Sequence, residues 1–224
     1  HAPGRRAARA VTEARASVAA LIGADPTEIV FTGCATEADN LAVLGVAGAS
    51  GGRHLVVSAI EHPAVLEPAM ELRRRGWGLT VLPVDSTGRV DPAAVAAELR
   101  PDTVLVSVMH ANNEVGTIQP VAEIAAMTRA RGVTLHTDAA QSVGKLPIDV
   151  DELGGEHEPV AEARRYAGGV DGEVAAAVVD EEVAGDAGPV HESAVGDEDV
   201  DVAVVVYVCG GRALVEAGRL DEGA

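Results

Sequence analysis

Residues 103–120 read TVLVSVMHANNEVGTIQP. The first seven, Thr103–Met109, form a continuous apolar run rich in β-branched side chains, which is typical of a strand buried on both faces of a sheet. The polar segment HANNEVG follows this run directly. Strands of this kind are usually parallel and covered by helices on both faces, so the stretch predicts an α/β fold.

The same pattern, an apolar run followed by polar residues, occurs three more times along the chain. The segments GCATEADN, EHPAV and DAAQS each follow such a run. The runs are Glu28–Thr32, His54–Ile60 and Val133–Thr137. Ligands bind beyond the carboxyl ends of the strands in open parallel sheets, so the four polar segments predict one shared site.

Segments with helical spacing separate the expected strands. Proline stands at the start of two of them and glycine follows the end of two, as helix termini prefer. The expected helices are Arg5–Leu21, a helix from Thr36, Pro63–Arg75, Asp91–Leu99 and Val121–Ala130, and a further strand covers Leu79–Val84. This alternation predicts a mostly parallel sheet with helices on both faces.

The composition bears on partners and location. The net charge of −18 argues against nucleic acid, which needs a basic surface. No stretch approaches the roughly 20 apolar residues that span a bilayer, so no membrane partner is expected. Two cysteines, Cys34 and Cys209, are too few for a disulfide framework and favour a reducing, cytoplasmic location. The chain opens on His1 and not on Met, which predicts a start inside a longer reading frame.

The charge is distributed unevenly. Residues 1–153 hold 18 acidic and 13 basic residues, whereas residues 154–224 hold 17 acidic and 4 basic ones. The second part has no clear helical or strand period apart from Val202–Val208, which reads as a strand. We therefore expect a cofactor-binding domain over 1–153 and a poorly structured acidic tail over 154–224.

Four segments taken together carry a family resemblance: FTGCATEADN, SAIEHPAVLEP, VSVMHANNEVGTIQP and LHTDAAQSVGKLPIDV. In order and spacing they resemble the cysteine desulfurases, within the class V aminotransferase family. The resemblance covers nearly all of residues 1–153. It implies the large-domain fold of the pyridoxal 5′-phosphate (PLP) transferases, with that cofactor bound. It also implies conversion of L-cysteine to L-alanine, a homodimer, and transfer of the sulfur to iron–sulfur scaffold or other acceptor proteins.

The resemblance assigns the phosphate of the cofactor to Ala35 and Thr36. A helix N-terminus presents backbone N–H groups to a phosphate, which fits this role. An ordinary N-cap threonine is the alternative. Gly33 and Cys34 stand where the family has Ser and Gly, so Cys34 is expected to be a substitution in the turn and not a nucleophile.

The resemblance also assigns contacts to the cofactor ring. Asp138 would keep the pyridine nitrogen protonated, Gln141 would donate to the ring hydroxyl oxygen, and Asn113 would contact the same side. His62 would stack on the ring and assist proton transfer. An Asp that caps a turn and a His in an ordinary loop are the alternatives for Asp138 and His62.

The remaining histidines are not expected to be functional. His110 and His136 lie inside the motif segments, and both are expected to be structural. Seven histidines with no Cys or carboxylate at ligand spacing predict no metal site.

Two residues of the family's chemistry are missing. The cofactor lysine belongs to a Ser-Gly-His-Lys segment, and a gapless extension of the register places Ala161–Arg164 there. Arginine stays protonated and cannot form a Schiff base. Lys145, in the GKLPIDV turn, has a different family counterpart and reads as a surface lysine. Cys209 lies among apolar residues, which do not activate a thiol, and is not expected to be the nucleophile.

Several interpretations remain open. A shifted reading frame near the codon for Gly154 explains the abrupt loss of resemblance and the low-complexity tail, and this abruptness favours it. A non-enzymatic relative whose acidic tail binds a partner is the second explanation. Another class V activity, such as selenocysteine lyase or aminotransferase, is the enzymatic alternative, although the EHPAV and HANNEVGTIQP segments favour a desulfurase.

The missing lysine leads to a prediction about activity. We expect the 224-residue chain, supplied with PLP and L-cysteine, to form no alanine or sulfide above a control with free cofactor, because Arg164 cannot replace a lysine. Borohydride reduction followed by peptide mapping checks the same point. Robust alanine production, or stoichiometric labelling of Lys145, would contradict the expectation.

Overall fold

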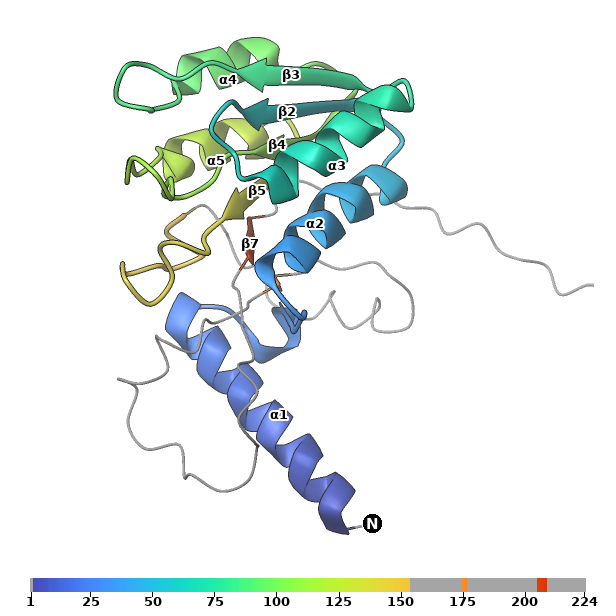
Figure 1. The fold of residues 1–224 in the computed structure, drawn as a ribbon, viewed down its shortest axis with the longest axis vertical. Coiled ribbons are helices and arrows are strands. Elements are labelled where there is room, and N and C mark those ends of the chain that lie inside the picture. Colours follow the sequence, from blue (N-terminus) through green and yellow to red (C-terminus); the bar gives the residue numbers. More distant parts are fainter. Residues whose placement is uncertain (1, 154–174, 177–204, 209–224) are drawn as a thin grey trace, which may run out of the picture.

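The computed structural model describes residues 2–153, 175–176 and 205–208 as one sheet flanked by helices (Figure 1). The strand order is β1-β6-β7-β5-β4-β2-β3. All described pairs are parallel except those of β7, which is antiparallel to β5 and β6. The strands are β1 (Ile29–Val30), β2 (His54–Ser58), β3 (Gly78–Leu82), β4 (Thr103–Ser107), β5 (Thr134–Asp138), β6 (Ala175–Ala176) and β7 (Val205–Val208).

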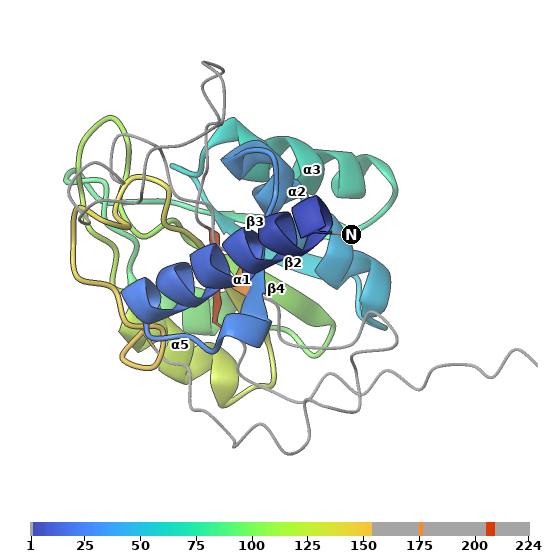
Figure 2. The same ribbon diagram turned by 90° about the horizontal axis from the view of Figure 1, so that it is seen from below.

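Helices cover both faces of the sheet, as Figure 2 shows from below. The helices are α1 (Ala2–Ile22), a 3-10 turn η1 (Pro26–Glu28), α2 (Ala35–Ala49), α3 (Pro63–Arg74), α4 (Pro92–Glu98) and α5 (Val121–Arg129). The core on one face includes α2 and α3, and the core on the other includes α1, α4 and α5. The predicted fold class, a mostly parallel sheet with helices on both faces, is confirmed.

The central strands divide their side chains between the two cores. Leu55 and Leu105 pack with α2 and α3, whereas Val56 and Val106 pack in the core of the opposite face. Successive side chains of a strand point to opposite faces, so a strand covered on both faces must be apolar at nearly every position. This requirement explains the uninterrupted apolar runs from which the sheet was predicted.

Side-chain caps explain where two of the helices begin. The Nδ1 atom of His62 accepts a hydrogen bond from the N–H of Ala64 at the start of α3 (3.1 Å). Asp91 accepts one from the N–H of Ala93 at the start of α4 (2.9 Å). In both helices proline follows the cap, where its missing N–H costs no hydrogen bond.

The elements expected from the sequence within 1–153 are present, with ends that differ by a few residues. In the acidic tail, the strand expected over Val202–Val208 is described as β7, Val205–Val208. The short strand β6, Ala175–Ala176, was not expected. The other expectations for residues 154–224 lie outside the described residues. Among the described residues, no helix has the length and apolar character needed to cross a membrane.

A matched pair of leucines tests the core. We expect Leu105→Ala to lower the free energy of unfolding by about 2–5 kcal/mol, because Leu105 is fully buried between β4 and the helices. Leu41→Ala removes the same atoms from a side chain on α2 that is 46% exposed, and should change stability by about 0.5 kcal/mol or less. Chemical denaturation monitored by circular dichroism measures both. Equal effects would mean that the core is misassigned.

Candidate cofactor site

Hydrogen bonds join the four polar segments at the carboxyl edge of the sheet. Asn40 of α2 donates to the carbonyl of Ala64 (3.3 Å), which links the starts of α2 and α3. Asn112, in the loop after β4, donates to the carbonyl of Ile60 (3.1 Å). His110 Nδ1 lies 2.8 Å from Ser142 Oγ in the loop after β5. The segments that were predicted to share a site are therefore directly connected.

Ala35 and Thr36 are the first two residues of α2. Ala35 is half-buried and Thr36 is exposed, so the first turn of the helix faces outward. First-turn N–H groups have no acceptor within their own helix and carry the positive end of the helix dipole. Cys34 occupies the N-cap position, is exposed, and makes no capping hydrogen bond through its side chain. This helix end can accept an anion.

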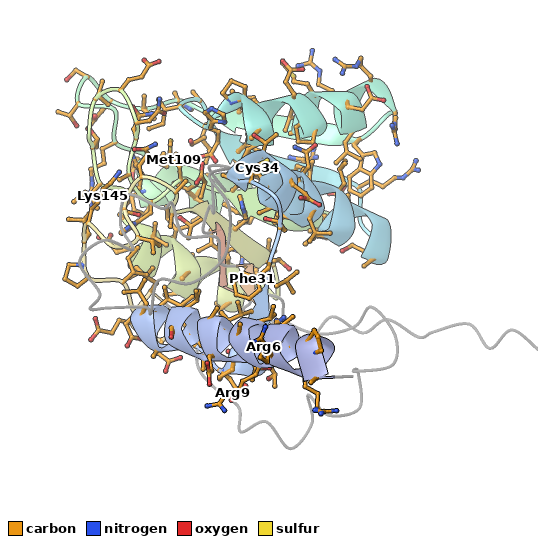
Figure 3. All side chains as sticks on the ribbon, turned by 60° about the horizontal axis from the view of Figure 1, so that its bottom comes forward. Arg6, Arg9, Phe31, Cys34, Met109 and Lys145 are labelled. Atoms are coloured by element: carbon orange, nitrogen blue, oxygen red, sulfur yellow. The ribbon has the colours of Figure 1, made fainter. Side chains whose placement is uncertain are left out.

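His62 lies opposite this helix end. Its side chain is exposed, and it shares with Thr36 the lining of an open groove of roughly 490 Å³ between α2 and α3. Figure 3 labels Cys34 and Met109, and it shows that Lys145 lies at the periphery of the structure. Thr36 and His62 therefore line one groove, whereas the other predicted site residues, Ala35, Asn113, Asp138 and Gln141, do not line it.

Asp138 ends β5 and is only 6% exposed. Its Oδ1 atom accepts a hydrogen bond from the N–H of Ala140 (2.9 Å). Burial and the nearby charge of Asp39 raise the pKa of Asp138, while the Ala140 bond and the charges of His136 and His62 oppose the rise. Asp138 and His62 therefore lie within electrostatic reach of each other.

Asn113 and Gln141 lie in the loops that follow β4 and β5, and both are exposed. The adjacent residues Asn112 and Ser142 are buried. Asn112 is 8% exposed, and its Oδ1 accepts hydrogen bonds from the N–H groups of Glu114 and Val115 (2.9 Å each). The loop conformation thus depends on Asn112 and leaves Asn113 free to face a ligand.

A buried polar cluster beneath this edge was not predicted as functional. Asp39 Oδ1 lies 3.4 Å from His136 Nε2, and the two side chains are 1% and 0% exposed. Glu61, 5% exposed, accepts hydrogen bonds from Ser58 (2.5 Å), Ser107 (3.0 Å) and the N–H of Met109 (2.7 Å). His136 is completely buried, and its buried acidic neighbours were not predicted.

The sequence did contain a signal for these carboxylates. Asp39 interrupts the apolar stripe of α2, between Ala38 and the buried pair Ala42 and Val43. A charged residue in the buried stripe of a helix requires a partner inside the protein. Glu61 follows the apolar strand β2 directly, and its burial likewise requires donors.

Comparison with known proteins identifies the family. The sequence model for class V aminotransferases matches residues 1–155, which is more than half of the chain. The chain belongs to the class V aminotransferase family. It is 52% identical over 155 residues to cysteine desulfurase IscS of Azotobacter vinelandii.

Solved structures share both fold and sequence with this class V protein. DndA from Streptomyces lividans is 48% identical with a TM-score of 0.64, over 69% of this chain and 43% of DndA. SspA, solved in complex with cysteine, is 39% identical with a TM-score of 0.65, over 68% of this chain and 45% of SspA. The IscS match covers 68% of this chain and 38% of IscS, so the chain spans less than half the length of these relatives.

Class V aminotransferases depend on PLP, and the described residues fit this cofactor. The N-terminus of α2 suits the phosphate, and the buried carboxylate of Asp138 suits the protonated pyridine nitrogen. His62 is exposed and lines a groove together with Thr36 of α2. The predictions for Ala161–Arg164 and Cys209 fall outside the described residues, and Lys145 is exposed in the turn after β5.

Adjacent asparagines permit a matched test of the loop after β4. We expect Asn112→Ala to destabilise the protein by about 1–3 kcal/mol, because three backbone groups lose their side-chain partner. Asn113→Ala should change stability by about 0.5 kcal/mol or less, since its side chain is exposed. Thermal unfolding of the two variants measures the difference, and a larger loss for Asn113→Ala would contradict this description of the loop.

Proposed function

We propose that this chain is the cofactor-binding part of a cysteine desulfurase. The observation that carries the proposal is the buried carboxylate of Asp138 at the end of β5, within electrostatic reach of His62 and on the same edge as the start of α2. The 52% identity to IscS of Azotobacter vinelandii supports a desulfurase over selenocysteine lyase or aminotransferase.

When bound, PLP withdraws electrons from the carbon that carries the substrate amine. Asp138 would sustain this by holding the proton on the pyridine nitrogen. A raised pKa does not prevent this role, because a protonated ring is itself a cation that stabilises the carboxylate.

The other site residues would position the ring. His62 would cover one face, and its Nδ1 already accepts from Ala64, so the ring orientation is fixed and Nε2 is left for proton exchange. Asn113 and Gln141 would donate amide hydrogens to the polar edge of the ring. The N–H groups of Ala35 and Thr36 would hold the phosphate.

Substrate, assembly and location are part of the same proposal. L-cysteine is the proposed substrate class, supported by SspA, whose structure was solved with cysteine. A homodimer and a sulfur acceptor that serves iron–sulfur or thiocofactor assembly follow from the likeness to IscS. The cytoplasm is the proposed location, on the grounds of the two cysteines.

Cofactor binding tests the proposal without needing a lysine. Pyridoxamine 5′-phosphate, a fluorescent form of the cofactor that binds noncovalently, should bind the full chain. We expect Asp138→Asn to weaken binding roughly tenfold or more, because an ionic hydrogen bond to the pyridine nitrogen is replaced by a neutral one. Affinity of the parent should fall as the pH drops through the raised pKa of Asp138, since the protonated carboxyl no longer attracts the ring.

Asp102→Asn is the matched control. Asp102 precedes β4 at the opposite edge of the sheet, and its contact with Arg100 is exposed, so its loss should leave the affinity unchanged. Fluorescence titration measures all three proteins. Absence of binding by the parent, or an equal loss in both variants, would reject the proposal.

A further inference from the structure

Four buried polar side chains form a continuous row beneath the candidate site. Asp39 Oδ1 lies 3.4 Å from His136 Nε2, and His136 Nδ1 lies 2.8 Å from Ser107 Oγ. Ser107 Oγ lies 3.0 Å from Glu61 Oε2. The row joins α2, β5, β4 and the segment after β2, and none of its members is more than 5% exposed. No step of the proposed cofactor chemistry uses these residues.

The hydrogen bonds of Glu61 restrict which groups in the row donate hydrogen bonds and which accept them. The N–H of Met109 can only donate, and it donates to Oε1, which also accepts from Ser58. Oε2 is left to Ser107. Burial and the charge of Asp138 raise the pKa of Glu61, whereas the hydrogen bonds from Ser58 and Met109 and the charge of His136 oppose the rise. In its ionised form Glu61 accepts from Ser107 at Oε2, and the oxygen of Ser107 then accepts from the Nδ1–H of His136.

Both ring nitrogens of His136 then face acceptors, Asp39 on one side and Ser107 on the other. This arrangement favours a proton on each nitrogen, which makes the ring a cation. Burial by itself lowers the pKa of His136, but Asp39 and the charges of Glu61 and Asp138 outweigh burial and raise it.

His136 and Asp138 lie two residues apart on β5, so their side chains point to the same face of the sheet. Among the described side chains, the charged groups that act on Asp138 are Asp39 of α2, His136 of β5 and His62 at the start of α3. Those that act on His136 are Asp39, Glu61 and Asp138. A cation at His136 offsets the repulsion between Asp39 and Asp138, whereas a neutral ring leaves it in place.

We propose that Glu61 and Ser107, acting through His136, are positioning residues that keep a buried cation beside Asp138 and thereby keep Asp138 ionised for the pyridine nitrogen. The proposal rests on the proposed function for its use of the cofactor ring, but the charge state of His136 does not. The residues of the row would not touch the cofactor themselves but would influence the charge of Asp138, which would contact it.

Two substitutions change the hydrogen bonds of the row without adding a charge to it. One reverses their direction between residue 61 and His136, and the other removes the hydrogen bond to His136. In Glu61→Gln, the Met109 N–H holds the amide oxygen at the Oε1 position, so the amide nitrogen must donate to Ser107. Ser107 then donates to Nδ1 of His136, which needs no proton there. Ser107→Ala removes the acceptor of the Nδ1–H altogether. Both changes should lower the pKa of His136.

Ser58→Ala is the matched control. Ser58 is as fully buried as Ser107 and also donates to Glu61, at 2.5 Å, but it donates to Oε1 and does not bridge to His136. Ser58→Ala removes a serine hydroxyl that donates to Glu61, as Ser107→Ala does, but the link from Glu61 through Ser107 to the imidazole stays in place. Thermal unfolding of each variant shows that the fold is retained.

The first measurement is the titration of His136 by ¹⁵N NMR in the full chain without cofactor. We expect Glu61→Gln and Ser107→Ala to lower the pKa of His136 by about one pH unit or more. Ser58→Ala should lower it by less, because Glu61 loses one donor but keeps the Met109 N–H and the bridge through Ser107. An unchanged His136 in both variants, or an equal fall in Ser58→Ala, would overturn the proposal. If Ser107→Ala does not fold, Glu61→Gln, which is nearly isosteric, decides the matter.

The second measurement is the pH dependence of pyridoxamine 5′-phosphate binding. In the two variants the acid limb of the affinity curve should move to higher pH, and at a fixed pH on that limb the affinity should fall roughly tenfold for every pH unit by which the limb moves. A uniform loss at all pH values would indicate a purely structural role and reject the proposal. Failure of the parent to bind would reject the proposed function, while the NMR titration would still test the row.

Discussion

The ion pair between Asp39 and His136 constrains much of this structure. A buried carboxylate without a partner costs several kcal/mol, so α2 must lie where Asp39 reaches the imidazole on β5. Asp39 is one helical turn from Ala35, so the same contact brings the first turn of α2 toward the carboxyl end of β5. The electrostatic influence of Asp39 on Asp138 agrees with this placement. An internal charge thus determines where the helix N-terminus stands.

The fold was predictable because the strands are buried on both faces. The centres of β2 and β4, residues 55–57 and 104–106, are apolar, whereas in β5 only Leu135 is apolar. Each of the three strands is followed by polar residues at the edge where parallel strands end. The antiparallel pairing of β7 with β5 was not predicted. It joins segments about 70 residues apart, and no local pattern encodes the partner or the direction of such a pairing.

The site was predictable in part. The edge that carries it followed from the strand pattern, but roles for His62, Asn113 and Gln141 came from the family resemblance. Local chemistry does not distinguish Asn112 from Asn113, because the two residues are chemically identical and adjacent. Only the folded loop shows that Asn112 turns inward to Ile60 while Asn113 is exposed. The partners of Asp39 and Glu61 were likewise set by tertiary contacts and could not be read from the sequence.

In three of the four polar segments, EHPAV, HANNEVG and DAAQS, two neighbouring residues have different roles. One residue of each motif is buried and bonded to another loop, and its neighbour is exposed at the edge. The pairs are Glu61 and His62, Asn112 and Asn113, and Ser142 and Gln141.

This pairing has a physical reason. A side chain that must meet a ligand cannot also hold its loop in place, because its polar atoms are committed only when the ligand arrives. A bonded neighbour supplies the rigidity in advance and lowers the entropy that binding must remove. In this protein the inward partners also touch one another's segments, through the Glu61 contact with Met109 and the Asn112 contact with Ile60. Displacing one of these loops would therefore break hydrogen bonds that hold another in place.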